Sequence, residues 1–280
     1  MKLRLTLAAA LAAILFATAD CGQSDSPREG IVSLSPVVTE ILYELGAGDR
    51  IAANTRFCNY PPQAKTKTKI GDFLNPNEEY IISMKPEIVI DTNSRAHVPL
   101  WGRLEKAGIK VVHLPIDTAD QVAAAYKIVG KAVGLGKKGG ELARRLLSDI
   151  EKLKTECSHV SHKKRVIFFV EYPNLTAVGG GTFIDNLISV VGGENIVSQK
   201  GWVLNFPQEK VVALKPDIII QAVDSEKIND KFVSDLNEFY RHTNAKIHVV
   251  NADEVTRPGP RIAEGWRGIA KILHPESFEN

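Results

Sequence analysis

The sequence lacks the patterns that mark most catalytic sites. It contains no Gly-x-Ser-x-Gly, no His-Glu-x-x-His and no phosphate-binding Gly-x-x-x-x-Gly-Lys. Gly134, Gly136 and Gly139 match the dinucleotide pattern Gly-x-Gly-x-x-Gly by letters, but they follow a predicted helix instead of a strand. We therefore expect no enzyme, and an enzyme or metallochaperone stays as a remote alternative.

Metal-ligating residues are also sparse. Of the seven histidines, only His159 and His162 could share a helix face, and they stand among serine and lysine residues where solvated side chains are expected. No metal site and no resident cofactor are predicted. Cys58 and Cys157 lie 157 − 58 = 99 residues apart. They could pair in an oxidising compartment, and the alternative is two unpaired thiols.

Excess charge and long hydrophobic runs are missing as well. The net charge of +2, with both signs mixed, gives no reason to expect a nucleic-acid partner. One apolar run, Leu5 to Phe16, is shorter than the roughly 20 residues that span a membrane. It follows Lys2 and Arg4, and a small-x-small cleavage pattern comes after it, so residues 1–19 are predicted to be a signal peptide.

The mature protein is therefore expected in the periplasm. Cys21 could carry a lipid that anchors the chain to the membrane, but Asp20 stands where a lipoprotein signal has a small residue. Periplasmic and lipid-anchored locations both stay open.

One segment of the chain occurs twice. The run from Glu79 to Ile90 returns from Glu209 to Ile220, a shift of 209 − 79 = 130 residues. Each copy begins with a glutamate in the first turn of a predicted helix, ends that helix at Lys-Pro, and continues into a short β-branched run typical of a buried strand. The repeat indicates a duplicated unit of helix and strand.

Strands alternate with helices on both sides of a long amphipathic segment. This alternation predicts parallel sheets with right-handed crossovers, an α/β fold of two Rossmann-like lobes. Leu142, Leu146, Ile150 and Leu153 form a helical apolar stripe, so a single helix should join the lobes. The predicted parts are a first lobe over 28–135, a connecting helix over 136–160 and a second lobe over 163–280.

The loops that follow the predicted strands carry aromatic, amide and arginine side chains. Two facing parallel sheets turn the carboxyl ends of their strands toward a shared crevice, where ligands usually bind. These residue types suit a large, partly apolar ligand with polar groups at its edge, whereas packing on proline-rich loops is the alternative. The candidate ligand contacts are Ser35, Pro36, Arg56, Tyr60, Phe73, Asn93, Arg95, Tyr172, Trp202, Phe206, Arg257 and Arg261.

Glu79 and Glu209 admit two interpretations. A glutamate in the first turn can simply oppose the helix dipole, worth about 0.3 to 1 kcal/mol. Two glutamates at equivalent places on two lobes also suit a two-fold partner that carries arginines.

Several segments together resemble one known family. They are 31–46, 56–64, 74–82, 192–196 and 257–262, and they keep the family's order over nearly all of the chain after Arg28. They resemble the helical-backbone, class III periplasmic binding proteins, which are the substrate receptors of ABC importers for cobalamin, haem and iron-siderophores. Tyr60-Pro-Pro and Asn75-Pro-Asn-x-Glu are most similar to the cobalamin branch.

The resemblance implies a monomeric, non-enzymatic receptor that captures a cobalamin-like corrinoid in the cleft between its lobes. It would deliver this ligand to an ABC permease dimer with its ATPase, and Glu79 and Glu209 match the glutamates that the family offers to permease arginines. An iron-siderophore or haem is the alternative ligand. Phe73 and Thr92 stand where cobalamin receptors tend to carry tryptophans, which is a departure from that branch.

Overall fold

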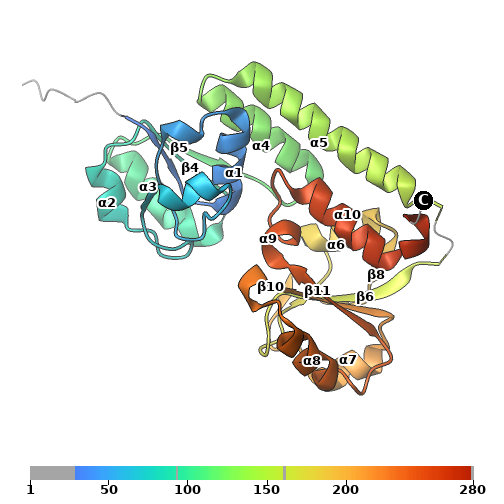
Figure 1. The fold of residues 1–280 in the computed structure, drawn as a ribbon. Coiled ribbons are helices and arrows are strands. Elements are labelled where there is room, and N and C mark those ends of the chain that lie inside the picture. Colours follow the sequence, from blue (N-terminus) through green and yellow to red (C-terminus); the bar gives the residue numbers. More distant parts are fainter. Residues whose placement is uncertain (1–28, 93, 160–161, 279–280) are drawn as a thin grey trace, which may run out of the picture.

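A computed structural model describes residues 29–92, 94–159 and 162–278 of the protein. Two α/β lobes are joined by one long helix, α5 (Gly136–Glu156), as Figure 1 shows. This arrangement confirms the predicted fold class. The predicted signal peptide and Cys21 lie outside the described residues.

The first lobe is built on a five-stranded sheet in which every pair is parallel, with the order β3-β2-β1-β4-β5. Its strands are β1 (Ile31–Ser33), β2 (Ile51–Asn54), β3 (Thr68–Lys69), β4 (Ile88–Thr92) and β5 (Val111–Leu114). Its helices are α1 (Pro36–Leu45), α2 (Glu78–Ser83), α3 (Val98–Lys106) and α4 (Ala119–Ala132), with short 3-10 turns at Gly48–Arg50, Pro62–Thr66 and Arg95–His97.

The second lobe has a six-stranded sheet of order β11-β10-β6-β7-β9, with β8 also paired to β6. Its strands are β6 (Lys164–Phe169), β7 (Ala177–Val178), β8 (Gly193–Asn195), β9 (Trp202–Val203), β10 (Ile218–Val223) and β11 (Lys246–Asn251). Its helices are α6 (Phe183–Val190), α7 (Gln208–Leu214), α8 (Asp230–Phe239), α9 (Ala252–Val255) and α10 (Ile262–Leu273), with 3-10 turns at Ser225–Lys227 and Pro275–Ser277.

The second sheet corrects the expectation of purely parallel pairing. β7 pairs antiparallel with both β6 and β9. Only a short loop separates β6 from β7, and a parallel crossover would need a dozen or more residues.

The connecting helix is packed along one side against α4, and Figure 1 shows the two helices side by side. The predicted stripe of Leu142, Leu146, Ile150 and Leu153 is buried, and it belongs to a hydrophobic core that continues from the first lobe into the second. At Gly139 a Cβ atom would lie 2.4 Å from the Tyr126 carbonyl oxygen, so glycine permits this close approach. Of the three glycines in the letter match, Gly139 therefore serves helix packing.

The sequence repeat is also a structural repeat. In each lobe the lysine before the proline leaves the helix with a positive φ, 44° at Lys85 and 47° at Lys215. The residue after the proline then donates its backbone N–H to a carbonyl oxygen of the neighbouring chain segment. Glu87 donates to Gly30, just before β1, at 3.0 Å, and Asp217 donates to Arg165, in β6, at 2.9 Å. The duplicated unit of helix and strand is confirmed.

The two cysteines of the described chain are unpaired. Cys58 lies in the loop after β2, where its sulfur is 3.2 Å from the Thr55 hydroxyl, and Cys157 caps the end of α5. Both are buried and free. Of the two possibilities that the sequence leaves open, the structure has the two separate thiols and no disulfide between them.

Candidate functional site

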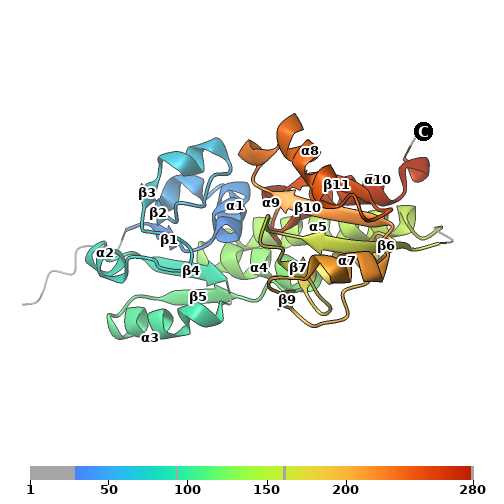
Figure 2. The same ribbon diagram turned by 90° about the horizontal axis from the view of Figure 1, so that it is seen from below.

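The loops at the carboxyl ends of the strands bring the two lobes into contact. Asn59, in the loop after β2, donates from Nδ2 to Asp253 Oδ2 in α9, which follows β11, at 2.6 Å. Figure 2 shows α1 of the first lobe facing α9 of the second. Because open parallel sheets bind ligands at this edge, the crevice between these loops is the candidate site.

Glu40 is the central acceptor of the junction between the lobes. It lies on the buried side of α1 and is 3% exposed. Arg261 donates from Nε and Nη2 to its two carboxylate oxygens at 2.9 and 2.8 Å, and Arg257 Nη1 lies 3.4 Å from Oε1. Since bidentate arginine–carboxylate pairs are strong and directional, they tie α1 to the segment before α10.

Arg257 makes further contacts across the junction. Its Nη1 donates to Asn59 Oδ1 at 2.7 Å and its Nη2 to the Phe57 carbonyl at 3.3 Å, both in the first lobe. Its Nη2 also lies 2.5 Å from Asp253 Oδ1 in its own lobe. Both Nη atoms of Arg257 therefore have acceptors.

These contacts change the role of two predicted ligand contacts. Arg257 and Arg261 do lie at the expected edge, but their donors are engaged by the other lobe, so we assign them to the inter-lobe junction. Sequence reasoning missed their partners Glu40, Asn59 and Asp253. The signal for such a junction in the sequence is Glu40 itself, because an acidic residue on the apolar, buried side of a helix needs a partner.

A cavity of about 560 Å³ opens beside this junction. Tyr60 stands at its border, 45% exposed, with the Arg261 guanidinium carbon 4.1 Å from the centre of its ring. Residues of both lobes line this cavity, and carboxylate and phenol side chains are frequent among them. Its lining is Glu40, Tyr43, Glu44, Asp49, Tyr60, Pro61, Gln63, Pro260, Arg261 and Glu264.

The aromatic candidates of the second lobe separate into surface and core. Trp202 is 52% exposed on β9, whereas Tyr172 is half-buried with its ring against the edges of Phe232 and Phe239. Phe206 is buried in the lobe's core, its ring 5.9 Å from that of Phe169. Phe206 was predicted to contact the ligand, but its side chain packs in the core of the lobe instead.

A smaller cavity, of about 240 Å³, lies at the carboxyl ends of β6, β10 and β11. It combines aromatic walls with an amide, two carboxylates and a lysine, which is a suitable lining for an amphipathic ligand edge. Its lining residues are Val170, Glu171, Tyr172, Asn174, Val223, Asp224, Lys227, Phe232 and Ala252. Tyr172 is the predicted candidate among them.

The remaining candidates lie in the first lobe. Arg56 is exposed and pairs with Asp72 at 3.0 Å, while Ser35 is buried at the start of α1, directly before Pro36. Asn93 lies outside the described residues, and so does the side chain of Arg95, whose backbone begins a 3-10 turn. Of the two arginine candidates in the first lobe, Arg56 is the one whose side chain the structure describes, and it faces solvent.

Phe73 is held in place by a buried ion pair. His97 Nδ1 lies 2.6 Å from Asp91 Oδ2, and its Nε2 lies 2.5 Å from the Phe73 carbonyl oxygen. Trp101 Nε1 also donates to Asp91, at 2.8 Å. Because both ring nitrogens of His97 face acceptors, the imidazolium satisfies the site better than the neutral ring.

The pKa of His97 is raised accordingly: the hydrogen bond to Asp91 raises it, burial opposes this, and the Asp91 charge and the Phe73 carbonyl add to the rise. A raised histidine pKa gives stability that is complete below about pH 6.5 and is lost as pH rises through the folded-state pKa. Neutralisation removes one hydrogen bond, so the loss should be about 1 kcal/mol.

We expect the free energy of unfolding in urea to decline as pH rises above about 6.5, and to decline less in His97→Gln. The comparison of the two slopes removes the contribution of other titrating groups. A variant that keeps the wild-type slope would contradict the assignment.

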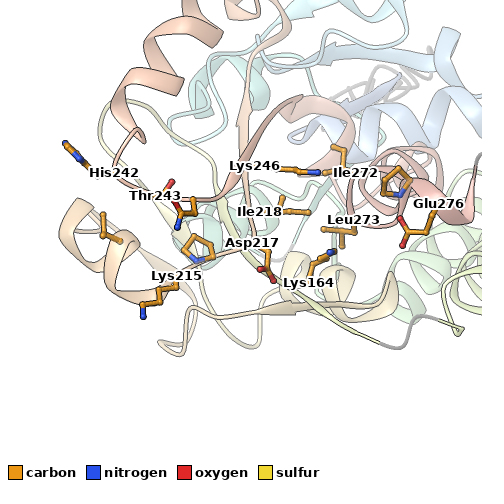
Figure 3. A pocket seen from close by; sticks show the side chains of 14 residues that line it. Lys164, Lys215, Asp217, Ile218, His242, Thr243, Lys246, Ile272, Leu273 and Glu276 are labelled. Atoms are coloured by element: carbon orange, nitrogen blue, oxygen red, sulfur yellow. The ribbon is translucent and has the colours of Figure 1, made fainter.

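A larger hollow, of about 690 Å³, lies at the other edge of the second sheet, where β6, β10 and β11 begin. Figure 3 shows Lys164 and Lys246 with Asp217 around it. Ligands of such sheets bind at the carboxyl edge, so its position speaks against a role as the ligand cleft.

Glu79 and Glu209 occupy equivalent places in the two lobes. Each is the second residue of its helix, α2 or α7, and each is exposed. Among the described residues neither side chain has a hydrogen bond or an ion pair, whereas the carboxylate of the adjacent Glu78 pairs with Arg103 at 2.6 Å. The structure therefore leaves both carboxylates available to a partner.

Comparisons with known proteins agree with this architecture. Residues 31–220 match the family model described as periplasmic binding protein. The chain belongs to the periplasmic binding protein family. YvrC of Bacillus subtilis (strain 168), named as a substrate-binding lipoprotein of an ABC transporter, is 32% identical over 89% of this chain and 81% of that protein.

Two further relatives carry ligand names. A vitamin B12-binding protein of Photorhabdus laumondii is 27% identical over 83% of each chain. The structure of the periplasmic haem-binding protein RhuT from Roseiflexus sp. RS-1 has a TM-score of 0.78 and 20% identity, covering 89% of this chain and 99% of that one. This periplasmic binding protein is thus a substrate-binding protein of the ABC-transporter type, and the family members are receptors and not enzymes.

No group of three or more histidine, cysteine, aspartate or glutamate side chains that could hold a metal occurs among the described residues. Within the same residues no helix is long and apolar enough to cross a membrane.

Proposed function

We propose that this protein captures a cobalamin-like corrinoid in the cleft between its lobes and delivers it to the permease of an ABC importer. The observation that best supports this proposal is the pair of exposed carboxylates of Glu79 and Glu209. They stand at equivalent positions of the two lobes and pair with no other side chain in the described part of the protein. A two-fold permease that presents an arginine to each would recognise both lobes at once.

The chemistry of the crevice supports a corrinoid. A broad ring with apolar faces can stack on the exposed Trp202 and Tyr60, and amides at its edge can meet Arg56 and the polar groups around Tyr172. The name of the Photorhabdus laumondii relative supports the same ligand class.

Haem or a ferric siderophore is the second candidate, because of Tyr60. A phenolate is a ligand for ferric haem iron, and the Arg261 charge lies over this exposed ring. The fold shared with RhuT is compatible with this ligand but shows the fold alone.

Calorimetry distinguishes the two candidates. We expect cyanocobalamin to bind with micromolar or tighter affinity, a free energy of about −8 kcal/mol or more favourable. Tyr60→Phe keeps the ring and removes the hydroxyl, so it should leave corrinoid affinity nearly unchanged. Heat from haemin or a ferric siderophore and none from cyanocobalamin would reject the corrinoid, and loss of haemin binding in Tyr60→Phe would then identify the iron ligand.

The proposed location is the periplasmic space, after removal of the signal peptide. The lipoprotein name of YvrC supports the alternative in which Cys21 carries a lipid. The mass of the mature amino terminus distinguishes the two.

A further inference from the structure

The repeat extends beyond the docking glutamates to an exposed leucine in each lobe. Leu74 stands five residues before Glu79, and Leu204 stands five residues before Glu209, so the two leucines keep the same shift, 204 − 74 = 130. Each is followed by asparagine. The repeated segment therefore includes a leucine and a glutamate, five residues apart, in both lobes.

These leucines are the two most exposed large hydrophobic side chains of the described residues, at 66% and 68%. Single exposed apolar residues are common on protein surfaces and need no explanation. Here two of them stand at equivalent positions, each close in sequence to an unpartnered carboxylate. Such a coincidence in register points to a shared partner.

Both leucines are held on ordered backbone. In the first lobe Asp72 Oδ1 accepts from the Leu74 and Asn75 N–H groups at 2.9 and 2.6 Å. In the second, Leu204 directly follows β9, which pairs with β7, and the Phe206 N–H then donates to the Leu175 carbonyl at 2.8 Å. A fixed side chain loses less conformational freedom on binding than a mobile one.

The sheet order gives the two loops equivalent places. β3 and β9 are the outer strands of their sheets, and each leads to its leucine and then to α2 or α7. Both α2 and α7 lie away from α5 in Figure 1. The pairs therefore lie on two lobes of one molecule, away from the connecting helix.

We propose that Leu74 and Leu204 are apolar anchors that insert into two equivalent recesses of the two-fold permease, beside the arginines that receive Glu79 and Glu209. This inference rests on the proposed function. A hydrogen-bonded charge pair orients the partner, and an apolar side chain that is desolvated beside it adds to the affinity of the complex. The partner is thus predicted to present, twice, a basic group next to an apolar recess.

The test measures binding of the ligand-free protein to its permease–ATPase complex in lipid nanodiscs. We expect Leu74→Ser and Leu204→Ser each to weaken the complex about tenfold, and the double variant about a hundredfold, since each loses one buried leucine. Ile128→Ser, on α4, removes an exposed apolar side chain of similar size and should have no effect. Affinity for cyanocobalamin, or for haemin where that is the ligand, should stay within about twofold in all variants.

Three outcomes would overturn the proposal. Loss of ligand affinity in the leucine variants would make these residues cleft contacts. An effect confined to one leucine would contradict a two-fold partner. Unchanged docking of the leucine double variant would reject the role of the leucines. If the double variant Glu79→Ala with Glu209→Ala then lost docking, the proposed docking function would stand; if it also docked normally, that function would be rejected as well.

Discussion

Replacing Glu79 and Glu209 together with alanine is expected to abolish delivery of ligand to the permease. Removing one partner of a hydrogen-bonded charge pair at an interface costs about 2 to 5 kcal/mol, and the two lobes act on separate arginines. The double variant should therefore bind the permease at least about a thousandfold more weakly. Uptake of the ligand by cells and binding to the purified permease complex both measure this.

The neighbouring glutamate supplies a matched control. Glu78 lies beside Glu79 at the start of the same helix, but its carboxylate already pairs with Arg103. Glu78→Ala removes the same charge from the same turn and should leave docking intact. Ligand affinity of the double variant should also be unchanged, because each first-turn glutamate adds only about 0.3 to 1 kcal/mol to its helix. Unfolding or lost ligand binding would show that these glutamates are caps or ligand contacts.

Local signals explain which elements could be predicted to the residue. α1 begins at Pro36, directly after Ser35, and ends at Leu45. Gly46 caps it with a φ of 85° and its backbone N–H, and Ser35, Pro36 and Gly46 are residue types that favour these positions. β7 and β9 were missed because two-residue strands show no periodicity and their pairing depends on distant partners. Local chemistry thus sets the helix ends, and tertiary contacts set the short strands.

The candidate site shows the same division. Arg257 and Arg261 were placed correctly at the carboxyl edge, because loop position follows from strand order. Their partner Glu40 was missed. An acidic residue on an apolar helix face stands out from the hydrophobic pattern, but the sequence does not show which basic residue pairs with it. Phe206 was misassigned because neighbouring residues of one loop can have opposite exposure. Leu204 is exposed to solvent whereas Phe206 is buried in the core, and the backbone conformation decides which side chain faces which way.

The junction between the lobes should depend on Glu40. Glu40→Ala leaves the guanidinium groups of Arg257 and Arg261, which are 15% and 16% exposed, without their shared carboxylate. Loss of one partner from such a buried pair costs about 3 to 5 kcal/mol. We expect urea unfolding to report a loss of this size, and solution scattering to report a larger radius of gyration as the lobes separate.

An exposed ion pair in the same lobe gives the scale for this effect. Glu87 pairs with Arg50 at 3.1 Å, with side chains 45% and 42% exposed, so Glu87→Ala should cost at most about 1 kcal/mol. Glu40→Gln keeps the size and part of the hydrogen bonding and should fall between the two alanine variants. If Glu40→Ala lost no more than Glu87→Ala, Asn59 and Asp253 would suffice for the arginines, and Arg257 and Arg261 would again be available to contact a ligand.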